Sequence, residues 1–177
     1  MTRNQVWWIA GTCLTLAAPV EGQGPNIRVQ VPGIPGVVLL DSIAERKRVI
    51  GNTEAILKAI DSAYAFFQLP VEAIDPAVGR LPNRRVTLSR RMGKTPLSRF
   101  LDCGRGFSGN YADMYRVTIS TAAWLSPPRG DTTEVNIAII GGALDPAGTG
   151  DGYVLCTSRG YFEADFARKV TEIVSRR

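Results

Sequence analysis

Three strand-like segments follow one another in the second half of the chain, and only short loops separate them. They cover residues 115–124, 133–140 and 153–157. The first alternates apolar and polar side chains, and the second is rich in β-branched residues, which favour strands. Strands that follow one another through short loops pair antiparallel, because a parallel pair needs a crossover of a dozen or more residues. The sequence therefore predicts an antiparallel sheet at the centre of the fold.

Two longer segments have helical periodicity and lie on either side of this strand-rich region. In the first, apolar side chains recur at helical spacing after Asn52, a favourable N-cap residue, and Pro70 ends the helix at about Gln68. The second runs from about Gly160 to Ser175. It has acidic side chains near its start and basic ones near its end, which complements the helix dipole.

Shorter elements complete the predicted order β-α-β-β-(short α)-β-β-β-α. Further strands are expected at residues 46–50, 71–74 and 85–91, and a short helical turn is expected to open at Thr95 and Pro96. The predicted fold class is α+β. It has an antiparallel sheet of about five to six strands with two long helices packed on one face, a helix-grip-like arrangement.

The N-terminus has the pattern of a secretory signal peptide. A short polar segment with Arg3 precedes an apolar run from Val6 to Ala18. This run of about 13 residues falls short of the roughly 20 that a membrane-spanning helix needs. We expect export with cleavage, which places the mature chain in the periplasm or outside the cell, and an uncleaved N-terminal anchor is the alternative. We expect no transmembrane span in the mature chain.

The chain is therefore expected to have three parts. Residues 1–23 are the signal peptide, residues 24–44 are an extended leader rich in Pro and Gly, and residues 45–177 are a single α+β domain. Short strands in the leader are expected at residues 27–31 and 37–40, where apolar side chains gather.

Export changes how the three cysteines are interpreted. If Cys13 leaves with the signal peptide, Cys103 and Cys156 remain, and an even number in an oxidising compartment indicates a disulfide. The bond would close a loop of about 54 residues, worth on the order of 4 kcal/mol in the chain-entropy model. The alternative is a nucleophilic or metal-binding thiol, but the chain offers no histidine to activate it and no CxxC spacing.

The absence of histidine excludes Ser-His-Asp triads, Cys-His dyads and every His-ligated metal site. We expect no catalytic residues, no metal and no cofactor. A carboxylate-based hydrolase stays as an alternative, because acids that lie apart in the sequence can meet in the fold. Residues 145–152 hold two carboxylates without a closing Glu, which is typical of a hairpin loop rather than an EF-hand.

Residues 104–109 match the GxGxxG pattern of dinucleotide-binding loops. Such a site needs a strand before the glycines and a helix opening from them. Here a short helical turn precedes them and a strand follows. The pattern is therefore interpreted as a flexible turn beside Cys103.

Positive charge is concentrated between Arg80 and Arg105. This stretch holds eight basic residues and one acid, a charge of +7 in a chain whose total is +5. It could meet an anionic partner, and the alternative is an ordinary solvated face. The expected partner is an envelope protein or an anionic envelope polymer, and export disfavours nucleic acid. The candidate anion-contact residues are Arg84, Arg85, Arg90, Arg91 and Arg99.

A second hypothesis is that the domain carries a small apolar ligand between the sheet and the last helix. Four apolar side chains would line such a cavity: Tyr115, Ile119, Phe162 and Phe166. Core packing is the favoured explanation of the same residues, so a cavity in the structure would support the carrier and a filled core would oppose it.

Three segments carry a resemblance to a known group of proteins: LSRFLDCG (97–104), GNYADMYRVT (109–118) and CTSRGYFE (156–163). Together they resemble a family of exported bacterial proteins without an assigned function, over roughly residues 45–175. The strand order also resembles the helix-grip domains of a small lipoprotein of the outer-membrane barrel-assembly machinery, which is a likeness of fold alone. These observations favour a non-catalytic extracytoplasmic domain that binds a protein or an anionic envelope component.

Overall fold

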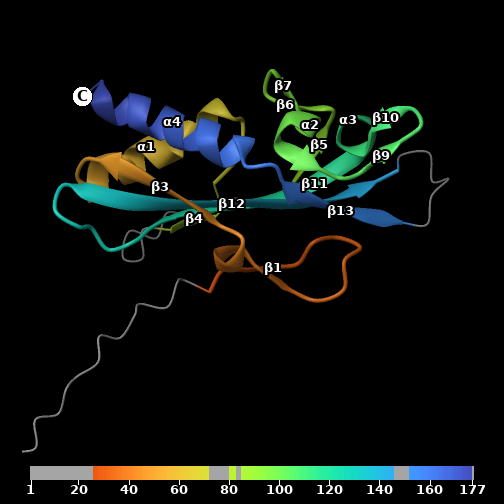
Figure 1. The fold of residues 1–177 in the computed structure, drawn as a ribbon, viewed down its shortest axis with the longest axis horizontal. Helices are drawn as coiled ribbons and strands as arrows, with labels where there is room; N and C mark the ends of the chain where they lie inside the picture. Colours follow the sequence, from red (N-terminus) through yellow and green to blue (C-terminus); the bar gives the residue numbers. More distant parts are fainter. Residues whose placement is uncertain (1–25, 72–79, 83–84, 146–151, 177) are drawn as a thin grey trace, which may run out of the picture.

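An antiparallel sheet forms the middle layer of the molecule (Figure 1). The computed structural model describes residues 26–71, 80–82, 85–145 and 152–176. The two longest strands, β11 (Arg116–Leu125) and β12 (Thr132–Leu144), pair along the whole of β11, from Arg116 opposite Leu144 to Leu125 opposite Val135. This pair carries the apolar alternation of the sequence and forms the centre of the sheet.

Shorter strands flank the central pair on both sides. The first half of β12 pairs with β3 (Glu45–Ile50), and its second half pairs with β13 (Tyr153–Ser158). On the other side, β11 pairs with β4 (Arg80–Pro82) and β5 (Val86–Ser89). The short strand β8 (Leu101–Asp102) extends the sheet beside β13.

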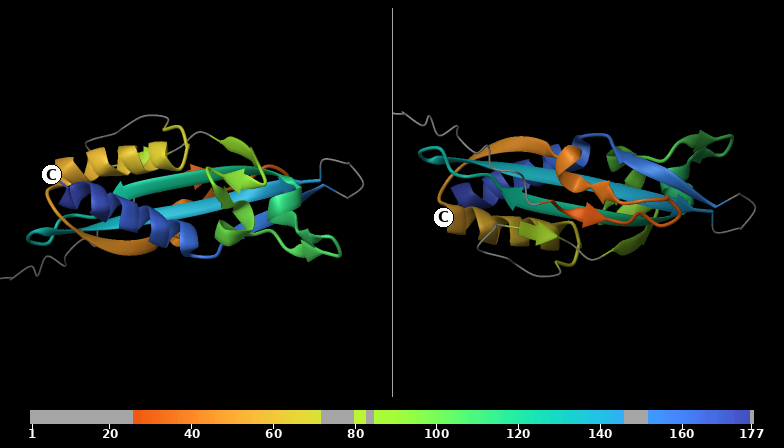
Figure 2. Two further views of the ribbon diagram at one scale, coloured as in Figure 1. Left: turned by 90° about the horizontal axis from the view of Figure 1, so that it is seen from above. Right: turned by 90° about the horizontal axis from the view of Figure 1, so that it is seen from below.

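Two long helices lie side by side on one face of this sheet (Figure 2). They are α1 (Thr53–Phe66) and α4 (Tyr161–Ser175). Asn52 is the N-cap of α1, because its side-chain oxygen accepts a hydrogen bond of 2.7 Å from the backbone N–H of Ala55. The predicted α+β class, with an antiparallel sheet and two long helices on one face, is confirmed.

The core between helices and sheet is built from aromatic rings. Phe67 follows the end of α1, and its ring centroid lies 5.3 Å from that of Phe162. Tyr64 meets Phe166 at 4.9 Å. Phe100 comes from the short helix α2 (Leu97–Phe100) and packs edge-on against Phe162. Offset and edge-to-face pairs of this kind stabilise a core beyond their buried area.

Two predicted short elements are present, but their bounds differ from those expected. Thr95 and Pro96 form strand β7 (Thr95–Pro96), which pairs with β6 (Arg91–Met92), and the helical turn starts only at Leu97. The expected strand over residues 85–91 ends at Ser89, because Arg90 has a φ of 67° and turns the chain. Of the strand expected at residues 71–74, only Val71 lies within the described residues.

The other face of the sheet is partly covered by the N-terminal segment, where β1 (Arg28–Val29) and β2 (Val38–Leu39) pair and η1 (Leu40–Ser42) follows (Figure 2). We call residues 26–44 the leader hairpin. Its Leu40 and Val31 are buried against Trp124 and Ile140 of the sheet. Gly142 permits this close approach, because a Cβ there would lie 2.7 Å from a backbone oxygen of the hairpin. The molecule therefore has three layers: helices, sheet and leader hairpin.

Among the helices of the described ranges, none combines the length and the apolar character that a membrane crossing requires.

Candidate functional site

An open hollow of about 900 Å³ lies on the leader side of the sheet, at the end that the leader hairpin does not cover. It lies over β3 and the adjoining ends of β11 and β12, and the loop between β11 and β12 forms part of its wall. We call it the arginine hollow. Its lining residues are Asp41, Arg46, Arg48, Trp124, Ser126, Pro127, Pro128, Arg129, Thr132, Glu134 and Asn136.

Strand alternation places two of its arginines side by side. Successive side chains of a strand point to opposite faces, so Arg46 and Arg48 share one face of β3 while Lys47 points to the other. Lys47 lies on the helix side, where its Nζ is 2.8 Å from a carboxylate oxygen of Glu45. In the register of the sheet, Arg46 lies opposite Asn136 and Arg48 lies opposite Glu134.

The floor of the arginine hollow is held by hydrogen bonds. The side-chain nitrogen of Asn136 donates to the backbone oxygen of Trp124 at 3.3 Å and to the hydroxyl of Ser126 at 2.9 Å. The backbone N–H of Ser126 donates to the backbone oxygen of Glu134 at 2.9 Å. Trp124 itself is only 5% exposed and packs into the core beneath the leader hairpin. The hollow therefore has a fixed polar floor rather than a flexible one.

Positive charge exceeds negative charge around the arginine hollow, which is lined by three guanidinium groups and two carboxylates. The Nε of Arg48 lies 3.8 Å from Glu134, and Arg48 is 80% exposed, so this ion pair is a loose one. Asp41 accepts a hydrogen bond from the backbone N–H of Ile27. Within the described part of the chain, neither Arg46 nor Arg129 takes part in an ion pair. Their guanidinium groups are available to an anionic ligand.

The structure distributes the predicted anion-contact residues over several surfaces. Arg84 lies outside the described residues. Arg85 precedes β5 and Arg90 follows it, so the strand, which spans about 13 Å, separates these two arginines. Arg91 is exposed in β6. Arg99 lies 3.2 Å from Asp165 and over the ring of a tyrosine on α4, so it is already engaged.

The arginine hollow was missed because its residues come from separate parts of the sequence. Arg46 and Arg48 stand in a short strand near the N-terminus, and Arg129 stands in a loop about 80 residues later, so only sheet pairing brings them together. One signal was present in the sequence. An Arg-Lys-Arg run in a strand places the two arginines on one face.

The residues expected to line an apolar cavity lie in different surroundings. Ile119, Phe162 and Phe166 are fully buried, and the last two rings lie 5.5 Å apart within the aromatic core. Tyr115 is only partly buried and stacks on Tyr111 at 4.6 Å. None of the four lines the arginine hollow. Their packing matches the core interpretation of these residues.

The motif segments behind the family resemblance are bonded to one another. The predicted disulfide between Cys103 and Cys156 is confirmed. Asp113, in α3 (Tyr111–Met114), accepts hydrogen bonds from both the backbone N–H and the hydroxyl of Ser98. Arg159 donates to the backbone oxygen of Ser98 at 3.0 Å and lies 3.7 Å from Asp102. These residues hold α2, β8, α3 and β13 together, which is a structural role.

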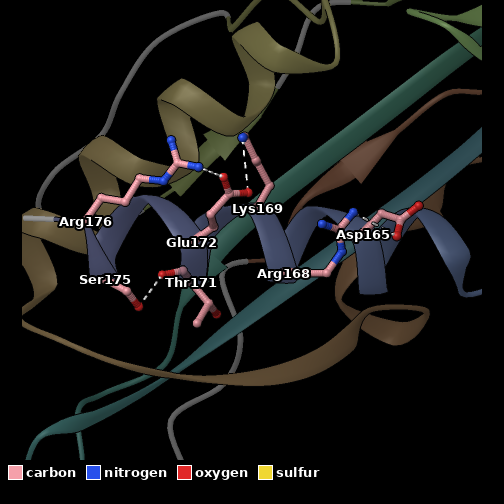
Figure 3. A network of polar contacts seen from close by, with 7 residues as sticks. All are labelled: Asp165, Arg168, Lys169, Thr171, Glu172, Ser175 and Arg176. Carbon is pink, nitrogen blue, oxygen red and sulfur yellow. Dashed lines mark hydrogen bonds and ion pairs between the residues drawn. The ribbon is translucent and has the colours of Figure 1, made fainter.

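The flank of α4 where Lys169 lies over the ring of Phe66 of α1 carries a row of ion pairs (Figure 3). Asp165 pairs with Arg168 and also with Arg99 of α2, and Glu172 pairs with Lys169 and Arg176. The hydrogen bond from Lys169 is the main cause that lowers the pKa of Glu172. Each of these four cations is already paired with a carboxylate, although the cations on this surface outnumber the carboxylates two to one.

Glu163 is an acid buried at the start of α4. Its side chain is 0% exposed, and one carboxylate oxygen accepts a hydrogen bond of 2.8 Å from Ser158, while the other finds no hydrogen-bond partner among the residues that the structure describes. Burial raises its pKa, the bond from Ser158 opposes that effect, and the nearby Glu45 and Lys47 act in opposite directions. A fully buried carboxyl group does not reach a substrate, so we assign Glu163 to the stability of the fold.

Within the described ranges, no cluster of three or more His, Cys, Asp or Glu residues has the arrangement of a metal site. The resemblance to an exported bacterial family stays a prediction, carried by the three motif segments. No protein-family model matches the chain, and the search of curated proteins finds no match.

Proposed function

We propose that this chain is a non-catalytic extracytoplasmic domain that binds an anionic envelope component through the arginine hollow. The observation that carries the proposal is the meeting of three arginines around one polar hollow, with Arg46 and Arg129 outside any ion pair of the described residues. A planar guanidinium group binds carboxylate or phosphate oxygens through two parallel hydrogen bonds.

The surroundings of the arginines favour binding of an anion. Trp124 and the two prolines of the β11–β12 loop contribute apolar surface to the wall of the hollow, and charge-assisted hydrogen bonds are stronger next to apolar surface than in bulk water. The floor formed by Asn136 and Ser126 is held before any ligand arrives, so little ordering is required on binding.

Two features support a location outside the cytoplasm. The disulfide between Cys103 and Cys156 is of a kind that persists in oxidising compartments and is rare in the cytosol. The apolar run from Val6 to Ala18 has the length of a signal-peptide core. On the resemblance of the three motif segments, we also propose that the chain belongs to a family of exported bacterial proteins.

Tryptophan fluorescence provides a direct test. Besides Trp124, the chain contains Trp7 and Trp8, both in the expected signal peptide, so emission from the exported form reports on the arginine hollow. The exported protein is titrated with polyphosphate and, separately, with poly-glutamate. We expect a saturable change in emission that weakens as salt rises, because the attraction is electrostatic.

Two double variants with equal loss of charge identify the binding surface. Replacing Arg46 and Arg129 by Ala should weaken binding of the preferred polymer at least tenfold. The control replaces Arg85 and Arg91 by Ala, two exposed arginines of the basic stretch, and should bind like the wild type. An equal loss in both variants would assign the effect to overall charge, and binding that neither variant weakens would contradict the proposal.

A further inference from the structure

A fully exposed phenylalanine stands at the tip of a small hairpin. The hairpin consists of β9 (Arg105–Gly106) and β10 (Gly109–Asn110), with Phe107 and Ser108 as its two-residue loop. Phe107 has a relative exposure of 110%, whereas the phenylalanines of the aromatic core are buried. The GxGxxG stretch therefore forms a hairpin that presents an aromatic side chain.

The hairpin is mounted on two stacked tyrosines. Gly106 lies so close to Tyr111 that an added Cβ would be 2.7 Å from the ring, so the backbone rests directly on it. Tyr111 in turn stacks on Tyr115, with ring centroids 4.6 Å apart and planes 9° apart. Gly109 has a φ of 132°, which side-chain-bearing residues rarely adopt. The glycines thus fit the hairpin to this aromatic support.

The base of the hairpin is tied at both ends. On one side, Cys103 is joined to Cys156 of β13, and the backbone N–H of Gly104 donates to Asp102 at 2.9 Å. On the other side, the backbone N–H of Tyr111 donates to the oxygen of Gly104 at 3.1 Å. The base of the hairpin that carries Phe107 is therefore held before any partner arrives, which lowers the entropic cost of ordering its backbone on binding.

The charges near the hairpin indicate what kind of surface it fits. Residues 101–116 contain two Arg and two Asp, and from other segments Arg159 lies 3.7 Å from Asp102 and Asp145 lies near Tyr115, so these charges balance and give no net attraction to an anionic bilayer. Arg105 is exposed at the base of the hairpin, and the partly exposed Met114 lies beside Gly109. An aromatic anchor next to an arginine, with charges of both signs around it, is typical of the centre and rim of a protein–protein interface.

We propose that the β9–β10 hairpin docks into a partner protein, with Phe107 filling an apolar pocket and Arg105 pairing with a carboxylate at the rim of that pocket. This surface is separate from the arginine hollow. Figure 1 places the hairpin at one end of the sheet and the β11–β12 loop, which lines the hollow, at the other. One molecule can therefore hold an anionic ligand and a partner protein at the same time.

Site-specific photo-crosslinking tests the proposal on the full chain. The photoreactive p-benzoylphenylalanine replaces Phe107, and in a matched control it replaces Phe66, which is 59% exposed on α1. Both proteins are irradiated in an envelope extract of the organism that makes the chain. We expect a protein adduct from position 107 that is absent from position 66 and that unlabelled wild-type chain displaces.

Competition with variants decides the outcome. The variants are added as unlabelled competitors of the adduct from position 107. Phe107→Asp and Arg105→Glu should each need a concentration at least tenfold higher than wild type to displace it, while Phe107→Tyr should displace it nearly as well as wild type. All three hairpin variants should keep the wild-type melting temperature, because the side chains of Phe107 and Arg105 are both solvent-exposed. Equal competition by Phe107→Asp, or no adduct that wild type displaces, would overturn the proposal.

Two other occupants give distinguishable results. In one test, the chain is sedimented with vesicles of phosphatidylglycerol and phosphatidylcholine. If wild type sediments with the vesicles and Phe107→Asp does not, the hairpin binds a bilayer instead. An adduct that consists of two copies of this chain would assign it to self-association. Either result would overturn docking to a partner protein and leave the arginine hollow unaffected, because the two surfaces share no residue.

Discussion

The two faces of the sheet are covered in different ways. On the helix face, α1 and α4 bury a continuous layer of aromatic and aliphatic side chains, with Phe162 and Phe166 fully inaccessible. On the opposite face, the leader hairpin buries a smaller group around Leu40 and Trp124 and leaves the end of β3 uncovered. The uncovered end is the place where Arg46 and Arg48 line the arginine hollow.

This difference separates stability from recognition. The buried side chains on the helix face are engaged in packing against one another, so they define the fold. The leader face is closed by a short hairpin with two-residue strands, and the sheet extends beyond it. If this comparison is right, changes on the helix face should mainly lower stability, and changes on the leader face should mainly alter binding.

The largest effect is expected from Phe162→Ala on the helix face. Phe162 contacts Phe67, Phe100 and Phe166, so its removal leaves a cavity that three rings border. We expect a loss of about 3–5 kcal/mol in the free energy of unfolding, measured by urea denaturation. A loss below about 1 kcal/mol would contradict the assignment of this cluster as the main core.

A somewhat smaller effect is expected from removal of the disulfide. Cys103 and Cys156 are separated by 53 positions, and their bond ties β13 to the base of the β9–β10 hairpin. The double change to Ser should lower the free energy of unfolding by about 2–4 kcal/mol. Mass spectrometry of the wild type without reductant should find the linked peptides, and two free thiols would contradict the structure.

On the leader face, Leu40→Ala should have a smaller and more local effect. Leu40 is fully buried, but the group around it is small and can partly collapse, so we expect a loss of about 2 kcal/mol. Emission from Trp124 should change already below the main unfolding transition, while the helical circular dichroism stays constant. A single transition with both signals changing together would show that the two faces unfold as one unit.

The sequence predicted best where one periodicity continues over many residues. The long helices follow from apolar spacing, and the central strands follow from alternation in β11 and from β-branched residues in β12, where consecutive side chains are buried. Thr95 and Pro96 were assigned to the wrong element because Pro is acceptable both at the start of a helix and in a short edge strand. The arginine hollow could not be assembled from the sequence, since it depends on the register between β3 and β12.

The smallest effect concerns the pH dependence of stability and compares two glutamates of α4. Burial raises the pKa of Glu163 in the folded state, so the stability it contributes is present below the unfolded pKa and is lost as pH rises through the folded pKa. The Glu163→Gln variant stays neutral and can still accept the hydrogen bond from Ser158. It should match the wild type at low pH and become the more stable of the two above the raised pKa, as measured by urea denaturation from pH 4 to 8.

Glu172→Gln is the matched control on the same helix. The bond from Lys169 lowers the pKa of Glu172, so its contribution is present above the unfolded pKa and is lost as pH falls through the folded pKa. This variant should therefore be slightly less stable than the wild type at neutral pH, and the difference should vanish in acid. If the two variants change stability in the same direction as pH rises, the effect of Glu163→Gln does not come from burial of Glu163. The contrast between the buried and the partly exposed glutamate of α4 would then fail.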